Sequence, residues 1–192
     1  MANSAGGAVS WYGTNGTLTD STFNNNQAGP YGGAVFWYGT NGTLTDSTFS
    51  NNNATDGGGL WWSGDNSKLI NSIFTNNIAN SRGGAIAWAC AGIISDITFD
   101  GNTVKGWAGG SIFFFGKGAI NNCNFINSKW INTYTQFNGI YALDDLTING
   151  GKGILDLFVN GTLSGISVVV LNNETYYYPP NANIKFHKQK YA

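Results

Sequence analysis

Leu18-Thr-Asp-Ser-Thr-Phe23 is the stretch that decides the fold, because versions of it recur along the chain. Its third position is usually Asp or Asn and once Gly, which tolerate left-handed backbone and form tight turns. Its first, fourth and sixth positions are small or apolar, which suits side chains that enter one interior from two strands separated by a bend. The versions start at Leu18, Leu44, Leu69, Ile94, Ile120, Leu143 and Leu163.

The spacing of these starts is nearly constant, at 26, 25, 25, 26, 23 and 20 residues. A corner repeated at such a period is typical of a solenoid, in which each repeat forms one coil hydrogen-bonded to the next. The sequence therefore predicts an all-β parallel solenoid of about seven coils. We expect coils over residues 1–171, regular over 1–129 and degenerate over 130–171.

The C-terminal residues 172–192 lack the repeat and are predicted to form a short cap or the start of a further domain. A turn is expected at Asn172-Asn173, a strand over 174–178 and a last short strand over 184–187. At the other end, residues 2–7 resemble the mid-repeat residues 79–84. Since an open solenoid end exposes unpaired strand edges, we expect the array to continue there or to be covered by another chain.

Two further landmarks accompany the first five repeats. A glycine pair precedes an aromatic-rich strand, and the residues two positions after the pair are expected to face the core: Val9, Val35, Trp61, Ile86 and Ile112. An asparagine follows the phenylalanine of the phrase at three residues' distance, at Asn26, Asn52, Asn77 and Asn102, with Ser128 in the fifth repeat. Stacked asparagines are predicted to form a hydrogen-bonded ladder along the axis.

The aromatic strands supply the candidate binding residues. Rings recur at nearly one per coil and, if exposed, would form a stripe able to stack on sugars: Trp11, Trp37, Trp62, Trp88 and Phe114. Strand alternation places Trp11, Trp37 and Trp88 on the same face as Val9, which favours an inward position for these three. The opposite parity selects Phe36, Trp62 and Phe113 as exposed rings, and these three are the predicted binding surface.

Composition limits the partners. Charged residues make up 10% of the chain and the net charge is −1, so the sequence predicts neither nucleic acid nor an anionic membrane as a partner. Since no apolar run approaches ~18 residues, membrane insertion by this segment is not expected either. No cofactor is predicted.

The acidic residues are the candidates for catalysis and metal binding. Asp20, Asp46 and Asp96 share one slot of the phrase and could imitate the carboxylates, often with calcium, of a polysaccharide lyase or glycosidase. Asparagine and glycine fill the same slot elsewhere, which favours a turn role, so no catalytic or metal site is predicted. Cys123 is expected to be a small buried residue, although a bridge between Cys90 and Cys123 stays open.

The landmarks resemble a known class of surface proteins. Gly32-Gly33-Ala34-Val35 with Phe49-Ser-Asn-Asn52, and Gly83-Gly84-Ala85-Ile86 with Phe99-Asp-Gly-Asn102, are similar to repeats of chlamydial polymorphic outer-membrane proteins. They resemble still more the adhesin-like surface proteins of methanogenic archaea. The likeness covers residues 1–130 well and the rest loosely, and it implies a right-handed parallel β-helix.

The resemblance also implies a function: a non-catalytic, cell-surface segment that presents a binding or stalk surface to glycans or to a surface protein of another cell. The alternatives are the polysaccharide-degrading enzyme, a viral tail fibre or spike segment, and an ice-binding surface, because Thr17-Leu-Thr19 and Thr43-Leu-Thr45 are expected to stack. Five Asn-x-Ser/Thr sequences, at Asn15, Asn41, Asn53, Asn160 and Asn173, would allow glycosylation.

Overall fold

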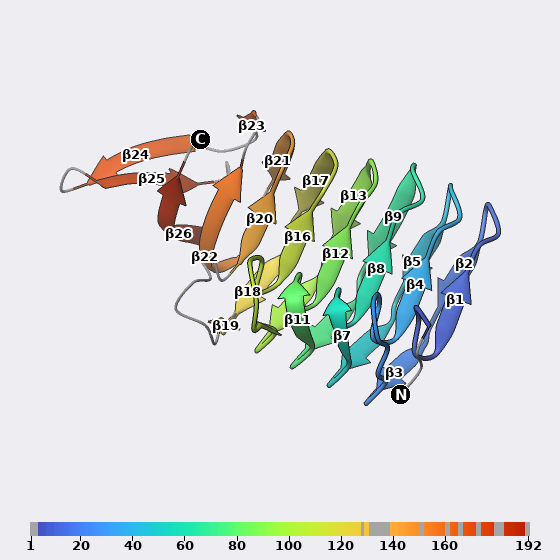
Figure 1. Cartoon of the computed structure of the whole chain (residues 1–192). Helices are drawn as coiled ribbons and strands as arrows, with labels where there is room; N and C mark the ends of the chain where they lie inside the picture. The colour runs from blue at the N-terminus through green and yellow to red at the C-terminus, as the bar shows by residue number, and fades with distance from the viewer. Residues whose placement is uncertain are drawn as a thin grey trace.

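The computed structural model describes residues 4–127, 129–130, 139–149, 152–159, 162–164, 167–171, 174–178 and 183–190. Every regular element in these ranges is a β-strand, and no helix occurs among them. The strands wind into coils that stack side by side along one axis (Figure 1). The predicted all-β parallel solenoid is therefore confirmed, and none of the described elements is a helix able to cross a membrane.

Three faces of the coil consist of parallel strands in register. The first face contains β1 (Val9–Trp11), β4 (Val35–Trp37), β8 (Leu60–Trp62), β12 (Ile86–Trp88), β16 (Ile112–Phe114) and β20 (Ile140–Ala142). The second contains β2 (Thr17–Thr19), β5 (Thr43–Thr45), β9 (Ser67–Ile70), β13 (Gly92–Ser95), β17 (Gly118–Asn121), β21 (Leu146–Asn149) and β23 (Leu163–Ser164). The third contains β3 (Thr22–Asn24), β6 (Thr48–Ser50), β10 (Ile73–Thr75), β14 (Thr98–Asp100) and β18 (Asn124–Ile126).

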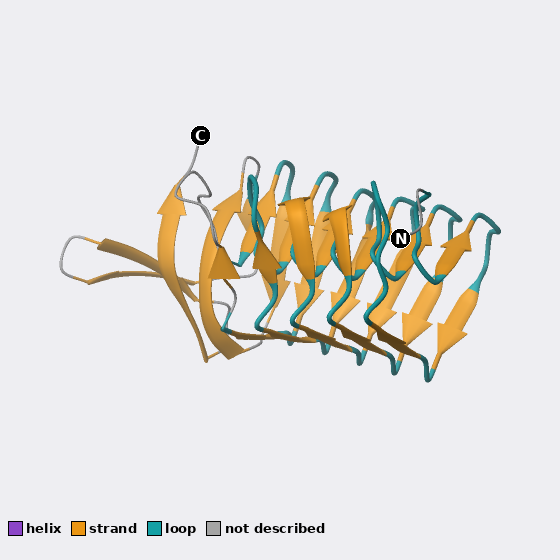
Figure 2. Ribbon diagram, turned by 60° about the horizontal axis from the view of Figure 1, so that its bottom comes forward, coloured by secondary structure: helices purple, strands orange, loops and turns teal. Residues whose placement is uncertain are grey.

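A short fourth sheet follows the third face. It consists of β7 (Asn53–Asp56), β11 (Ile78–Arg82), β15 (Thr103–Val104) and β19 (Lys129–Trp130). Short loops at the corners connect successive faces (Figure 2).

The C-terminal strands depart from the coil pattern. β22 (Lys152–Val159) pairs with both β18 and β20 and so joins the third face to the first, and β26 (Asn183–Lys190) pairs with β22 in parallel. β24 (Ser167–Leu171) and β25 (Glu174–Tyr178) form an antiparallel hairpin that extends from the end of the stack (Figures 1 and 2). The boundary predicted at residue 171 falls between the two strands of this hairpin, and the predicted turn at 172–173 lies outside the described residues.

The coil count is lower than predicted, at about five turns. In the sixth repeat Ile148 pairs with Ile120 and Leu146 with Gly118, so Ile148 occupies the first position of the phrase where the sequence placed Leu143. The true step from Ile120 to Ile148 is 28 residues, longer than the step of 23 that the sequence suggested, so the phrase predicted at 143–148 starts after β20 and ends in β21. Leu163 pairs with Leu146, and β24 then turns into the hairpin instead of adding a parallel rung.

The corner itself is formed as expected. The third residue of the phrase has a positive φ in the first five repeats: Asp20 (48°), Asp46 (53°), Asn71 (43°), Asp96 (57°) and Asn122 (50°). This is the left-handed region that Asp and Asn occupy more readily than other residues with a Cβ. The conformation explains why the slot alternates between Asp and Asn.

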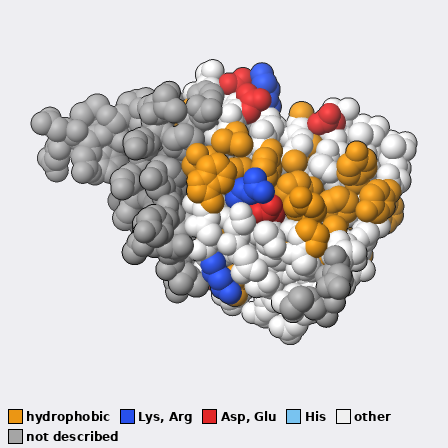
Figure 3. All heavy atoms as spheres, in the orientation of Figure 1, with side chains coloured by type: hydrophobic (Ala, Val, Ile, Leu, Met, Phe, Trp, Pro, Cys, Tyr) orange, Lys and Arg blue, Asp and Glu red, His pale blue; other side chains and the backbone are white. Residues whose placement is uncertain are grey.

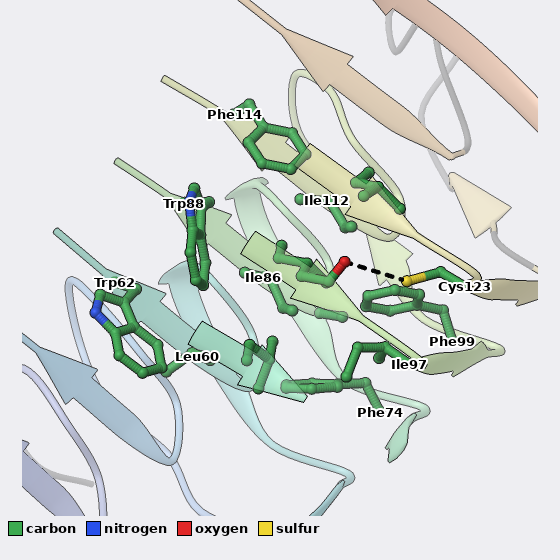
Figure 4. Packing of buried hydrophobic residues seen from close by; sticks show 14 of the residues in the cluster. Leu60, Trp62, Phe74, Ile86, Trp88, Ile97, Phe99, Ile112, Phe114 and Cys123 are labelled. Carbon is green, nitrogen blue, oxygen red and sulfur yellow. Dashed lines mark hydrogen bonds between the residues drawn. The ribbon is translucent and has the colours of Figure 1, made fainter. Parts of the chain in front are cut away.

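The interior is one continuous apolar core that contains two columns of aromatic rings. Phe23, Phe49, Phe74, Phe99 and Phe125 stack from the third face, with ring centroids 4.5–5.7 Å apart. Trp11, Trp37, Trp62, Trp88 and Phe114 fill the corner between the first two faces. Figure 4 shows the two columns entering the same interior from different strands. Cys90 and Cys123 are buried and unbridged, which confirms the prediction of a small buried residue at Cys123.

The predicted asparagine ladder is present. In each step the side-chain oxygen of one asparagine accepts from the backbone and side-chain N–H groups of the asparagine one coil before it, at 2.9–3.1 Å. The ladder runs through Asn26, Asn52, Asn77 and Asn102, and Ser128 lies outside the described residues.

Candidate binding surface

The outward side of the first face carries the candidate site. Each of its strands has three residues, the outer two of which point inward, so the middle residue faces outward. Parallel pairing places the middle residues in one row along the axis: Ser10, Phe36, Trp61, Ala87, Phe113 and Tyr141.

Trp62 was predicted to be exposed, and that prediction is wrong. The third repeat has three consecutive glycines, and Gly57, with φ +64°, takes the place of Gly32. Leu60 therefore pairs with Val35 and Trp61 with Phe36. The sequence prediction takes Gly58-Gly59 as the glycine pair, which displaces the predicted strand by one residue. A displacement of one residue exchanges the inward and outward faces of a strand. Trp62 is thus 0% exposed in the core, while Trp61, predicted inside, lies on the outer surface.

Phe36 and Phe113 do point outward, but the expectation that they are exposed is also wrong. Their exposed fractions are 8% and 0%, because neighbouring aromatic side chains cover them. The prediction that Trp37 and Trp88 face inward is confirmed by their burial in the core.

A first group of rings surrounds Phe36. Tyr12, Tyr31 and Tyr38 lie with their ring centroids 5.8, 6.2 and 6.5 Å from the Phe36 ring. Tyr31 also contacts Trp61 at 4.4 Å. The three tyrosines are 66%, 38% and 59% exposed in that order, so they present ring surface to solvent above a buried phenylalanine.

A second group of rings surrounds Phe113. Tyr141 stacks on Phe113 at 5.1 Å with an interplanar angle of 8°. Trp107 contacts both rings, at 5.5 and 5.3 Å, and is 50% exposed. Phe115 packs against Phe113 at 4.6 Å. Here too a buried phenylalanine supports an exposed aromatic side chain.

An ion pair and an aromatic contact connect the two groups. Arg82 donates from Nε and Nη2 to the Asp56 carboxylate at 3.1 and 2.7 Å, and its guanidinium lies 4.9 Å from the Phe115 ring centroid. The ring centroids of Trp61 and Phe115 are 5.3 Å apart. The coil between these two residues carries the small residue Ala87, which leaves the two rings free to meet. Bidentate pairing and stacking on a ring both hold the guanidinium in one position.

We call this surface the aromatic band. Figure 3 shows its hydrophobic side chains crossing the face in a row, with a basic and an acidic patch between them. The band consists of Tyr12, Tyr31, Phe36, Tyr38, Trp61, Trp107, Phe113, Phe115 and Tyr141, together with Arg82 and Asp56.

The acidic column lies elsewhere, at the corner between the second and third faces. Asp46 accepts a hydrogen bond from the Thr45 hydroxyl at 2.7 Å and one from the Asn71 amide at 2.5 Å, and these bonds lower the pKa of its carboxyl group. Asp96 accepts from Asn122 in the same way, at 2.7 Å. The carboxylates are therefore used to connect neighbouring turns. No group of three or more His, Cys, Asp or Glu side chains that could hold a metal occurs within the described ranges.

The comparisons with known proteins agree with this architecture. The family described as "Right handed beta helix region" matches residues 1–149. This chain belongs to that right-handed β-helix family. Neither a curated protein nor a solved structure matches it significantly.

Proposed function

We propose that this chain is a non-catalytic segment of an adhesin-like cell-surface protein, and that its aromatic band attaches it to glycans. The observation that carries the proposal is the exposure of Tyr12, Tyr31, Tyr38 and Trp107 on a single face. Exposed apolar surface of this kind marks binding sites on soluble proteins. A sugar ring has an apolar face of C–H groups and a rim of hydroxyls, which matches aromatic faces next to hydrogen-bonding groups.

The scaffold supports this role. Phe36 and Phe113 are held by parallel strands on both sides, so the rings that pack on them start from a rigid base. A preorganised surface loses little conformational entropy on binding. The band runs along the side of the stack, from Tyr12 beside β1 to Tyr141 in β20, as expected of a segment that presents a lateral surface.

Tryptophan fluorescence tests the proposal. We expect a panel of soluble oligosaccharides to include one that changes the emission of the protein, because Trp107 is half exposed in the band. Trp107→Ala and Tyr38→Ala should each weaken that binding by roughly 2- to 10-fold, the equivalent of one aromatic contact of about 0.5–1.5 kcal/mol. Ile73→Ala is the matched control, because Ile73 is an exposed apolar residue on the third face.

Binding that is unchanged in both band variants would contradict the proposed site, and no binding to any glycan would contradict the proposed function. The enzymatic alternative has its own outcome. If incubation with polysaccharides released shorter chains, and Asp46→Asn abolished the release, the acidic column would have to be reassigned as a catalytic site. Ice binding has less support, because Lys68 and Ile70 follow Thr43 and Thr45 in the threonine rows.

A further inference from the structure

We propose that the ligand of the aromatic band is an uncharged, linear polysaccharide that lies along the solenoid axis and contacts the rings at both ends of the band. This inference rests on the proposed function and adds the chemistry and the orientation of the ligand.

The orientation follows from the strand register. The outward positions of the first face lie in a single row that crosses the strands. Since neighbouring strands are ~4.8 Å apart, the six strands of this face extend over ~24 Å. Ring contacts continue along this row, from Tyr12–Phe36 through Trp61–Phe115 to Phe113–Tyr141. The band is therefore long in the axial direction.

The length of the ligand follows from where the band is exposed. Tyr12 and Tyr38 follow the first two strands of the first face, while Trp107 packs on Phe113 and Tyr141 in the fifth and sixth strands of that face. The rings between them are covered to a greater extent: Phe36 and Phe113 are buried and Trp61 is half-buried. From Tyr38 to Phe113 there are three coil steps, or ~14 Å. A single sugar cannot contact both exposed ends, whereas a chain of several sugars can.

The charge of the ligand follows from the ion pair at the middle of the band. Arg82 and Asp56 are the charged members of the band, and they are bonded to each other. Asp56 is buried, so an anionic sugar that drew Arg82 away would leave an unpaired carboxylate, which is costly. A cationic sugar would likewise lack a free carboxylate. The paired charges instead offer polar N–H groups that suit neutral hydroxyls, and the tyrosine hydroxyls both donate and accept.

The experiment is a titration with oligosaccharides of increasing length, followed by tryptophan fluorescence and calorimetry. Linear uncharged oligosaccharides are compared with oligouronates of the same lengths. We expect affinity for the uncharged series to rise roughly 100-fold from the disaccharide to the hexasaccharide, because the two ends of the band then act on one molecule. The oligouronates should not bind at the same concentrations.

Two variants test simultaneous contact with both ends. Tyr38→Ala and Trp107→Ala should each weaken hexasaccharide binding by roughly 2- to 10-fold, and each should reduce the gain with length from roughly 100-fold to about 10- to 50-fold. Ile73→Ala should leave the length dependence unchanged, and matched circular dichroism spectra would verify that the variants are folded.

Each other outcome overturns the inference. Equal affinity for all lengths would contradict the axial orientation and leave the proposed function standing. Equal or tighter binding of oligouronates would contradict the neutral ligand. Absence of binding to any sugar would defeat the proposed function as well. Sedimentation that showed a dimer dissociated by Trp107→Ala would make the band an interface between copies of this chain.

Discussion

Glycines, which lack a Cβ atom, leave the space that the buried tryptophan rings occupy. A Cβ atom at Gly42 would lie 2.6 Å from Nε1 of Trp37, and one at Gly92 would lie 2.8 Å from Cζ2 of Trp88. Both distances are too short for real contacts, so these glycines make room for the ring column at the corner between the first two faces. In the third coil Ser67 takes this place, and its buried hydroxyl donates to the carbonyl oxygen of Gly64.

Cysteine reactivity provides a prediction at the same scale. Burial raises the pKa of the Cys123 thiol to about 12 and that of Cys90 still further. Because only the thiolate reacts, we expect thiol reagents at neutral pH to label the native protein roughly 1,000-fold more slowly than the unfolded protein. Rapid labelling of two thiols in the native protein would contradict this burial.

The same pKa shift has a consequence for stability. The folded state holds the Cys123 proton more tightly than the unfolded chain, whose thiol has a pKa of ~8.5. The stabilisation is fully present below that pH and is lost as the pH rises toward the folded value of about 12. Cys123→Ala should therefore reduce the alkaline loss of stability in urea titrations.

The asparagine ladder is the element that connects successive corners. Asn77 donates to the backbone carbonyl of Phe49 at 2.9 Å and to the Asn102 side chain at 3.0 Å, and it accepts from Asn52. Its side chain is completely buried and fully hydrogen-bonded. Removing it leaves several buried groups without partners.

We expect Asn77→Ala to lower the free energy of unfolding by about 3 kcal/mol, since each buried unsatisfied group costs about 1–3 kcal/mol. The matched control is Asn26→Ala at the first rung, where the side chain is half-buried and water can replace the lost bonds. Urea unfolding measures both. Equal losses in the two variants would argue against burial as the cause.

At the scale of the whole molecule, stability depends on the shared core. Phe99 is fully buried and stacks on Phe74 at 5.7 Å and on Phe125 at 5.1 Å, one ring from each neighbouring coil. Because each coil is stabilised chiefly by its neighbours, loss of a ring from a central coil weakens the interfaces on both sides of that coil.

Phe99→Ala should therefore destabilise the protein by about 3–5 kcal/mol, which corresponds to a fall in melting temperature of roughly 10 °C for a chain of this size. Calorimetry measures the shift, and Ile73→Ala, exposed on the neighbouring strand, should change it little. A melting curve identical to that of the parent would contradict the central role of the phenylalanine column.

Sequence alone determined the repeat, the corner and the ladder. The sequence predicts a left-handed turn at Asp20, an inward ring at Phe23 and a stacked amide at Asn26, because each property depends on residue type and local spacing. It also favoured an inward position for Trp37 and Trp88, since strand parity counted from the glycine pair is local as well.

Tertiary structure decided the register of the third and sixth repeats and the composition of the aromatic band. Three consecutive glycines allow two alignments, and pairing of Leu60 with Val35 selects the one that buries Trp62 and places Trp61 on the outer surface. Tyr31 and Trp107 join the band from segments before the first-face strands, and no local spacing brings them onto Trp61 and Phe113. Exposure depends on what neighbouring coils place above a ring, and that is a property of packing between coils.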